Sequence, residues 1–288
     1  MRIALVTQEE PFYLPPALDT LCRIRQKDIV ALIILPSFNE KLSATARRLY
    51  EFYGPWDFIC LSGRFIWAKI ADNLNRLGTL TRPYSAVDVA RRHDISIYKP
   101  SNINSTEFVT TLRDEIHPDL IISIAASQIL KQRVLEVAPL GCINLHSAPL
   151  PRYQGMMPNF WTMFHNEFEA AVTVHYMVEE LDAGDIIVQL PVPIFPTDSL
   201  HNLMVRSKRI GVQALLEATE QIEQRTVQGK PMDATQTTYF SFPKRVDTIL
   251  KSHNTVGASC EGADAFPPLL LYKCFLLQKW FRINPDPE

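Results

Sequence analysis

An asparagine and a histidine stand two residues apart near the middle of the chain, in the segment that runs from Gly141 to Pro151. Side chains at positions i and i+2 of an extended segment point to the same side, so Asn144 and His146 are expected to face one cleft. An amide donor beside an imidazole suits an oxygen that becomes negative during acyl transfer. Asp182, farther along the chain, could orient that imidazole and keep it protonated. This spacing predicts an acyl-transfer site.

Short apolar runs alternate with segments of helical periodicity along the chain. Strands are predicted at 3–6, 29–35, 95–99, 120–124, 142–145, 172–177 and 186–192, and helices at 17–26, 42–53, 105–116, 131–137 and 199–222. Residues 11–16 are predicted to form a turn. Uninterrupted apolar strands that alternate with helices indicate an α/β fold with a Rossmann-like, doubly wound, mostly parallel sheet. Such sheets bind ligands at the carboxyl ends of their strands, which is where Asn144 and His146 fall.

The character of the sequence changes after Gly229. We expect a catalytic domain over residues 1–228 and a short C-terminal extension over residues 229–288. Residues 239–243 predict an aromatic docking segment and 254–265 a loop. The apolar residues of 267–282 are too few to span a bilayer, which takes about 20 residues. Packing on the domain itself, contact with a membrane surface and formation of a homodimer stay open for this segment.

Composition is typical of a soluble enzyme, with 47% hydrophobic and 21% charged residues. A net charge of −2 gives no global attraction to nucleic acid or to anionic membranes. Five cysteines without a C-x-x-C pair argue against a disulfide framework and against a zinc site. With no signal-peptide pattern at the start, this cysteine usage predicts a reduced, cytoplasmic location. Dinucleotide, phosphate-loop, zinc-protease and serine-hydrolase motifs are missing from the sequence.

Three motifs in this order resemble the folate-dependent formyltransferases. They are Asn-x-His-x-x-x-Leu-Pro-x-x-x-Gly from Asn144 to Gly155, Val-Thr-Val-His ending at His175, and Leu-Asp-Ala-Gly ending at Gly184. The resemblance extends over about residues 119–211. It implies the formyltransferase fold and, as co-substrate, 10-formyltetrahydrofolate, whose formyl group passes to an amine without a metal. It also implies that Asn144 and His146 hydrogen-bond the oxyanion, and that Asp182 keeps His146 charged and helps to move the amine proton.

The resemblance also implies which residues meet the two substrates. Folate would lie along two loops, whose matching residues here are Gln128, Ile129 and Leu130 in the first, and Val178, Glu179 and Leu181 in the second. For the acceptor, the residues around the catalytic loop are candidates, namely Arg152, Tyr153, Asn159 and Trp161, although aromatic residues there are more often core residues. Asp182 could also be a simple turn former, and His175 is expected to be structural.

Departures from the family pattern bear on the acceptor. Gln154 stands where many members have a basic residue, and Ala171 where glycine is common. Gln8-Glu9-Glu10-Pro11 replaces the glycine-rich phosphate loop of the phosphoribosylglycinamide enzymes, which argues against that acceptor. The extension after Gly229 is shorter than the C-terminal barrel of methionyl-tRNA formyltransferases and has no basic stripe.

We therefore expect an N-formyltransferase that acts on a small-molecule amine, with a nucleotide-linked amino sugar favoured and nucleic acid disfavoured as partner. Formylation of methionyl-tRNA is the second reading. A non-catalytic binding module with a formyltransferase-like fold is the third, and the intact set of Asn144, His146 and Asp182 argues against it.

Overall fold

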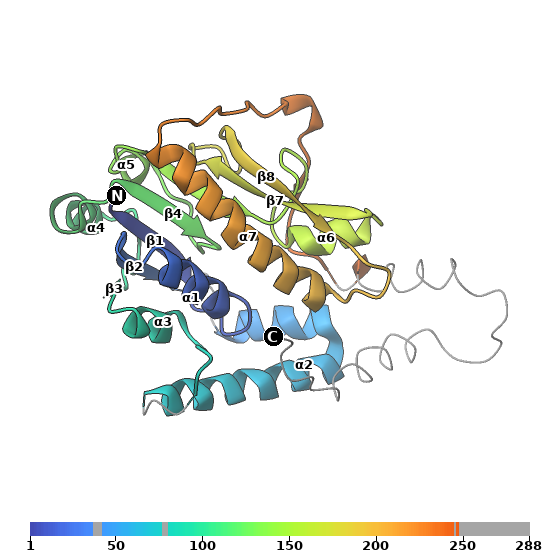
Figure 1. Cartoon of the computed structure of the whole chain (residues 1–288). Coiled ribbons are helices and arrows are strands. Elements are labelled where there is room, and N and C mark those ends of the chain that lie inside the picture. Colours follow the sequence, from blue (N-terminus) through green and yellow to red (C-terminus); the bar gives the residue numbers. More distant parts are fainter. Residues whose placement is uncertain (37–41, 77–79, 245, 248–288) are drawn as a thin grey trace, which may run out of the picture.

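A seven-stranded sheet forms the centre of the molecule (Figure 1). The computed structural model describes residues 1–36, 42–76, 80–244 and 246–247. Across the sheet the strands are β3 (Ser96–Tyr98), β2 (Ile29–Leu35), β1 (Ile3–Gln8), β4 (Leu120–Ile124), β5 (Cys142–His146), β7 (Glu169–Tyr176) and β8 (Ile186–Pro193). Neighbours from β3 to β5 pair in parallel, whereas β5, β7 and β8 pair antiparallel. The predicted α/β class with a mostly parallel sheet is confirmed.

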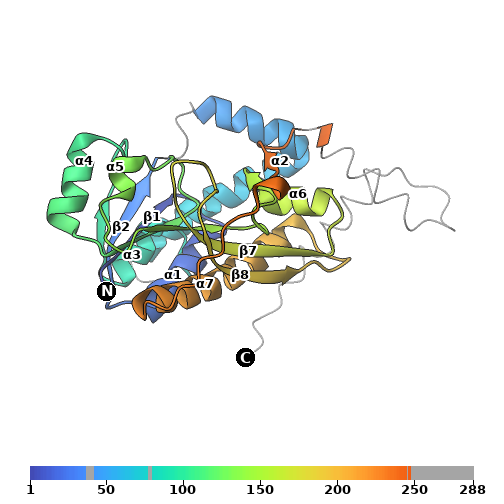
Figure 2. The same ribbon diagram turned by 90° about the horizontal axis from the view of Figure 1, so that it is seen from above.

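Helices cover both faces of this sheet. One face carries α1 (Leu14–Ile24), α3 (Ala86–Arg92) and α7 (Leu200–Glu223), and the other carries α4 (Thr106–Thr111), the π-helical η1 (Leu112–Ile116) and α5 (Gln132–Leu135). From above, the sheet lies between these two layers (Figure 2). Because both faces are buried, the central strands read as unbroken apolar runs.

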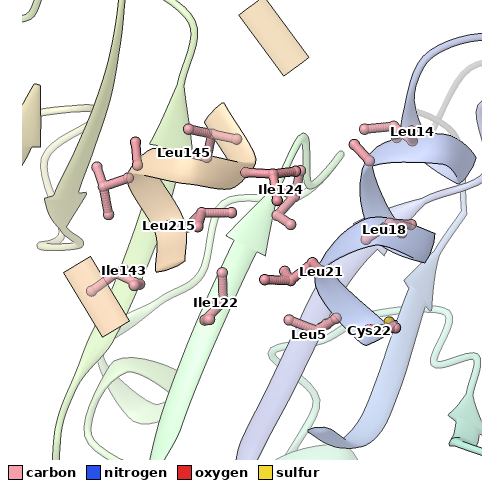
Figure 3. Close-up of a cluster of buried hydrophobic side chains, with 14 of the residues drawn as sticks. Leu5, Leu14, Leu18, Leu21, Cys22, Ile122, Ile124, Ile143, Leu145 and Leu215 are labelled. Carbon is pink, nitrogen blue, oxygen red and sulfur yellow. The ribbon is translucent and has the colours of Figure 1, made fainter. Parts of the chain in front are cut away.

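The larger of the two cores lies between the sheet and the layer of α1 and α7. Figure 3 shows Leu18 and Leu21 of α1 facing the strands, with Leu215 of α7 beside Ile122 and Leu145. Gly211 of α7 permits this close packing, because a Cβ there would lie 2.7 Å from Leu145 Cδ2. The packing of α7 against Leu145 thereby fixes β5, the strand that contains Asn144 and His146.

Helix α2 (Leu42–Asn75) is longer than the sequence predicts. The expected helix over 42–53 is present, but a second half follows a break at Gly54, which has φ 76° and ψ 172° and precedes Pro55. Proline is tolerated in the first turn of a helix, so it can begin the second half. This half was missed because apolar residues occupy both its buried and its exposed faces, so no polar face marks it as an amphipathic helix.

One other predicted boundary is wrong, and one predicted helix changes type along its length. Helix α1 begins at Leu14, inside the segment predicted as a turn, because Pro15 and Pro16 occupy its first turn. The predicted helix over 105–116 changes from α-helix to π-helix at Leu112.

Glu10 closes the amino-terminal end of α1. Its carboxylate accepts hydrogen bonds from the backbone N–H groups of Phe12, Tyr13 and Leu14 at 2.7, 2.8 and 3.1 Å. These are the free N–H groups with which a helix start binds an anion. The anion position after the first strand is therefore filled by the chain itself.

The described part of the C-terminal extension packs on the rest of the molecule. Lys230 pairs with Ile186 of β8, and β9 (Tyr239–Phe240) pairs with β6 (Gln154–Gly155). Phe240 stacks on Tyr153 and Trp161, which confirms the predicted aromatic docking segment. The predicted loop over 254–265 and the apolar segment 267–282 lie outside the described residues. Within the described ranges, no helix is long and apolar enough to cross a membrane.

Candidate active site

Strand β5 delivers Asn144 and His146 to one side of the sheet at its carboxyl end. Asn144 lies opposite His175 and His146 opposite Thr173 in the antiparallel pairing with β7. The Asn144 Nδ2 atom lies 3.2 Å from His175 Nε2, and His146 Nδ1 lies 3.6 Å from Asp182 Oδ2. The structure thus brings together the three residues that the sequence singled out, and adds His175 to them.

Backbone contacts fix the proton positions of His146. Its Nε2 atom lies 2.8 Å from the carbonyl oxygen of Tyr153, and the side chain is buried. A carbonyl oxygen only accepts hydrogen bonds, so Nε2 carries a hydrogen. Its Nδ1 then faces the Asp182 carboxylate, which stabilises a proton on that nitrogen.

His175 was expected to be structural, and the structure places it against the site. Its Nδ1 lies 2.8 Å from its neighbour's carbonyl, that of Tyr176, so Nδ1 carries the hydrogen and Nε2 has a free lone pair. Burial lowers the pKa of His175 from 6.5 to about 4, and His146 acts in the same direction although Asp182 opposes it. Neutral His175 can therefore accept a hydrogen bond from the Asn144 amide.

This contact orients the Asn144 carboxamide. An amide nitrogen has two hydrogens, and His175 takes one of them. The second hydrogen of Asn144 Nδ2 stays available to a ligand oxygen. The signal that could have found His175 is its cross-strand register with Asn144, which the sequence alone does not give.

Asp182 connects the segment after β5 to the loop that precedes β8. Its Oδ2 accepts a hydrogen bond from the backbone N–H of Gly155 at 3.1 Å, and its carbonyl oxygen accepts one from Gln154 Nε2 at 2.9 Å. Its other oxygen, Oδ1, lies 3.8 Å from His175 Nε2. Asp182 adopts φ 52°, in the left-handed region that Asp tolerates better than most residues.

Gly184 allows this second loop to close. A Cβ at Gly184 would lie 2.0 Å from the carbonyl oxygen of Tyr176, a distance that no side chain tolerates. The glycine of the Leu-Asp-Ala-Gly motif is therefore required for steric reasons, because no larger residue fits against Tyr176.

Two polar side chains of the hairpin hold the loop after β5. Thr173 donates its hydroxyl to the Ala148 carbonyl at 2.7 Å, and Gln189 donates to Thr173 Oγ1 at 2.8 Å and to the Leu150 carbonyl at 3.0 Å. The Leu150–Pro151 peptide is cis. These bonds hold the segment that leads from β5 to Tyr153, whose carbonyl oxygen contacts His146.

The residues predicted to bind folate differ in how far their side chains are exposed to solvent. Ile129 is 62% exposed, and Val178, Glu179 and Leu181 are exposed too. Leu130 is buried in the core, and Gln128 bonds the backbone of 101–103. An open hollow of about 390 Å³ adjoins the second loop and is lined by Gln132, Leu135, Glu136, Met177, Val178, Glu179 and Glu180.

The predicted acceptor residues mostly face inward. Tyr153, Asn159 and Trp161 are buried, and each polar end has a protein partner: Glu167, Ser207 and the Ser241 carbonyl, respectively. Arg152 is exposed and pairs with Glu167 at 3.0 Å. Among the described residues, no group of three His, Cys, Asp or Glu side chains could hold a metal ion.

The neutral state of His175 has a consequence for stability. Its pKa is lower in the folded protein than in the unfolded chain, so between pH 6.5 and pH 4 the unfolded chain binds a proton that the folded protein does not. This contribution to stability is complete above pH 6.5 and is lost as the pH falls toward 4. We expect His175→Gln to reduce the loss of unfolding free energy between pH 7 and pH 5 by about 2 kcal/mol, measured by urea denaturation. An unchanged pH dependence in the variant would contradict a neutral, buried His175.

The family model "Formyl transferase" matches residues 70–219, which is 150 of 288 residues and so just over half of the chain. The methionyl-tRNA formyltransferase of Syntrophus aciditrophicus is 36% identical over 162 residues, covering 56% of this chain and 52% of that protein. The same enzyme of Acetivibrio thermocellus is 32% identical over 205 residues, covering 70% and 66%.

Two solved structures show the same fold. An N-formyltransferase from Helicobacter canadensis, in complex with folinic acid and dTDP-3-aminofucose, matches with a TM-score of 0.53 and 17% identity over 84% of this chain and 71% of that one. Glycinamide ribonucleotide transformylase 1 from Symbiobacterium toebii matches with a TM-score of 0.54 and 18% identity over 81% and 94%. The chain spans about half the length of the first curated relative it matches. By its match to the family model, and with the fold to support it, the chain belongs to the formyl transferase family.

Proposed function

We propose that this protein transfers a formyl group from 10-formyltetrahydrofolate to the primary amine of a small molecule. The observation that carries the proposal is the convergence of Asn144, His146 and Asp182 at the carboxyl end of β5. The set offers an amide donor, an imidazole and a carboxylate, which are the groups that acyl transfer to an amine requires.

In the proposed reaction the acceptor nitrogen attacks the formyl carbon, and the bond from that carbon to N10 of the folate breaks. Asn144 donates its second amide hydrogen to the oxygen that becomes negative. His146 would turn its N–H from the Tyr153 carbonyl toward the same oxygen, while the Asp182 carboxylate balances its charge. The proton lost by the amine moves through water beside Asp182 to the departing N10.

The exposed apolar residues of the two predicted loops support the folate assignment. Ile129 lies in the first loop, and Val178 and Leu181 lie in the second; the hollow beside α5 adjoins the second loop. Flat apolar walls with nearby backbone polar groups suit a pterin ring. The solved neighbour from Helicobacter canadensis was crystallised with folinic acid, which is in line with this assignment.

For the acceptor, we propose a nucleotide-linked amino sugar. Glu10 fills the helix start at which a phosphate of phosphoribosylglycinamide would be held, which disfavours that acceptor. Arg152 is the candidate contact for a pyrophosphate, because it is exposed and its pairing with Glu167 can be exchanged. The Helicobacter canadensis neighbour holds dTDP-3-aminofucose. Formylation of methionyl-tRNA is the second candidate, because the curated relatives carry that name.

Removal of a catalytic side chain should abolish most of the turnover. We expect Asn144→Ala and His146→Ala to lower kcat by about 100- to 1000-fold, the scale of one oxyanion donor, with melting temperatures close to that of the parent protein. Asp182→Ala should be comparably damaging. Release of tetrahydrofolate is the measurement, and Arg113→Ala, an exposed change far from the site, is the control. Near-normal turnover in any of the three variants would contradict its proposed role.

The identity of the acceptor is tested by offering the two candidate acceptors in separate reactions. Purified protein receives 10-formyltetrahydrofolate with either nucleotide-linked amino sugars or charged initiator tRNA. We expect formylation of an amino sugar with a weak salt dependence, because a small acceptor makes few phosphate contacts. Formylation of the tRNA alone, weakening steeply with salt, would replace the proposed acceptor with the second candidate.

A further inference from the structure

The second half of α2 presents a continuous apolar stripe to solvent. The stripe, called the α2 stripe below, consists of six side chains that are each between 38% and 61% exposed: Trp56, Ile59, Ile66, Trp67, Ile70 and Leu74. Their spacing places them on one face of the helix. Single exposed apolar residues are ordinary on protein surfaces, whereas a contiguous apolar patch marks an interaction site.

The opposite face of the same half-helix is fixed to the protein. Ala68 and Ala71 are buried, and Asn75 donates to Asp88 of α3 at 2.9 Å. The Ser85 hydroxyl donates to Asp72 at 2.5 Å. These contacts hold the helix in one orientation, so the stripe stays at the surface. Figure 1 shows this half of α2 along the outer edge of the molecule.

The charges beside the stripe are basic. Of the charged side chains from Pro55 to Arg76, Lys69 and Arg76 are exposed, while Asp57, Arg64 and Asp72 are half-buried. The chain as a whole has a net charge of −2, so this basic character is local. A Trp- and Ile-rich surface with a basic rim is the composition of a helix that lies in a membrane interface.

The remaining apolar segment of the chain shares this chemistry. Residues 267–282 contain Trp280 with Lys273, Lys279 and Arg282, and contain no acidic residue. Near the end of the described residues the chain contacts the first half of α2, because the rings of Phe242 and Phe52 lie 5.5 Å apart.

We propose that the α2 stripe docks the protein on the surface of an anionic lipid bilayer, with Trp56 and Trp67 inserted at the level of the headgroups. Charge complementarity favours this occupant over two others. A second copy joined through the same stripe would bring two basic rims together, and so would coverage by residues 267–282. An anionic bilayer instead attracts both segments, and stable attachment to a membrane surface usually takes two signals. The inference does not rest on the proposed formyl transfer.

Sedimentation with vesicles tests the proposal on the full chain. We expect the protein to bind vesicles of phosphatidylcholine and phosphatidylglycerol, and to bind vesicles of phosphatidylcholine alone much more weakly. The double substitution Trp56→Ser with Trp67→Ser should lower the partition coefficient about tenfold or more, since binding scales with buried apolar area. Lys69→Gln should lower it about fivefold, the effect of one basic residue near an anionic surface.

Matched variants separate the stripe from general effects. Phe168→Ser removes an aromatic side chain that is 93% exposed in the turn before β7, and Lys230→Gln removes an exposed lysine elsewhere, so both should bind as the parent does. Ile66→Ser is a second stripe variant in case the double variant unfolds, and melting curves check folding.

Three results would overturn the proposal. The first is an absence of binding to the anionic vesicles. The second is a dimer in sedimentation equilibrium that the stripe variants dissociate while vesicle binding stays absent. The third is vesicle binding that Trp280→Ser abolishes and the stripe variants leave unchanged, which would assign the membrane contact to residues 267–282 instead.

Discussion

The carboxylate of Asp182 is the group on which the arrangement of the site depends. One oxygen faces His146 Nδ1 and accepts the Gly155 N–H, and the other faces His175 Nε2. A buried carboxylate needs donors such as the Gly155 N–H and the His146 ring, because burial without hydrogen bonds costs several kcal/mol. The requirement joins the loop after β5 to the loop before β8. The two histidines beside it differ, because burial keeps His175 neutral against the attraction of this carboxylate, whereas His146 turns a ring nitrogen toward it.

The difference between the two histidines follows from their surroundings. Both donate to a backbone carbonyl, so each has one nitrogen already committed. His146 turns its second nitrogen to a carboxylate, whereas the nearest partner of His175 Nε2 is the amide of Asn144. An amide N–H stabilises a lone pair and repels a proton. In the proposed reaction His175 is therefore a positioning residue for Asn144, because it takes one amide hydrogen and leaves the second for the formyl oxygen.

Sequence patterns predicted the parts of this structure that depend on local periodicity. The buried strands at 29–35 and 120–124 match the observed strands because parallel strands covered on both faces must be apolar throughout. The i, i+2 spacing of Asn144 and His146 indicated a shared side of β5. The position of His175 depends on the register between β5 and β7, which no local pattern encodes. The second half of α2 escaped detection because a helix that is apolar toward both protein and solvent has no clear amphipathic signal.

The central claim, that Asn144 and His146 act on the formyl oxygen of a bound folate, is tested most directly by a crystal structure with 5-formyltetrahydrofolate. The account predicts the pterin ring between the loops that contain Ile129 and Val178. It also predicts the formyl oxygen within hydrogen-bond distance, about 3 Å, of Asn144 Nδ2 and of a His146 ring nitrogen that has left the Tyr153 carbonyl. A folate bound with its formyl group away from both side chains, or bound elsewhere on the molecule, would contradict it.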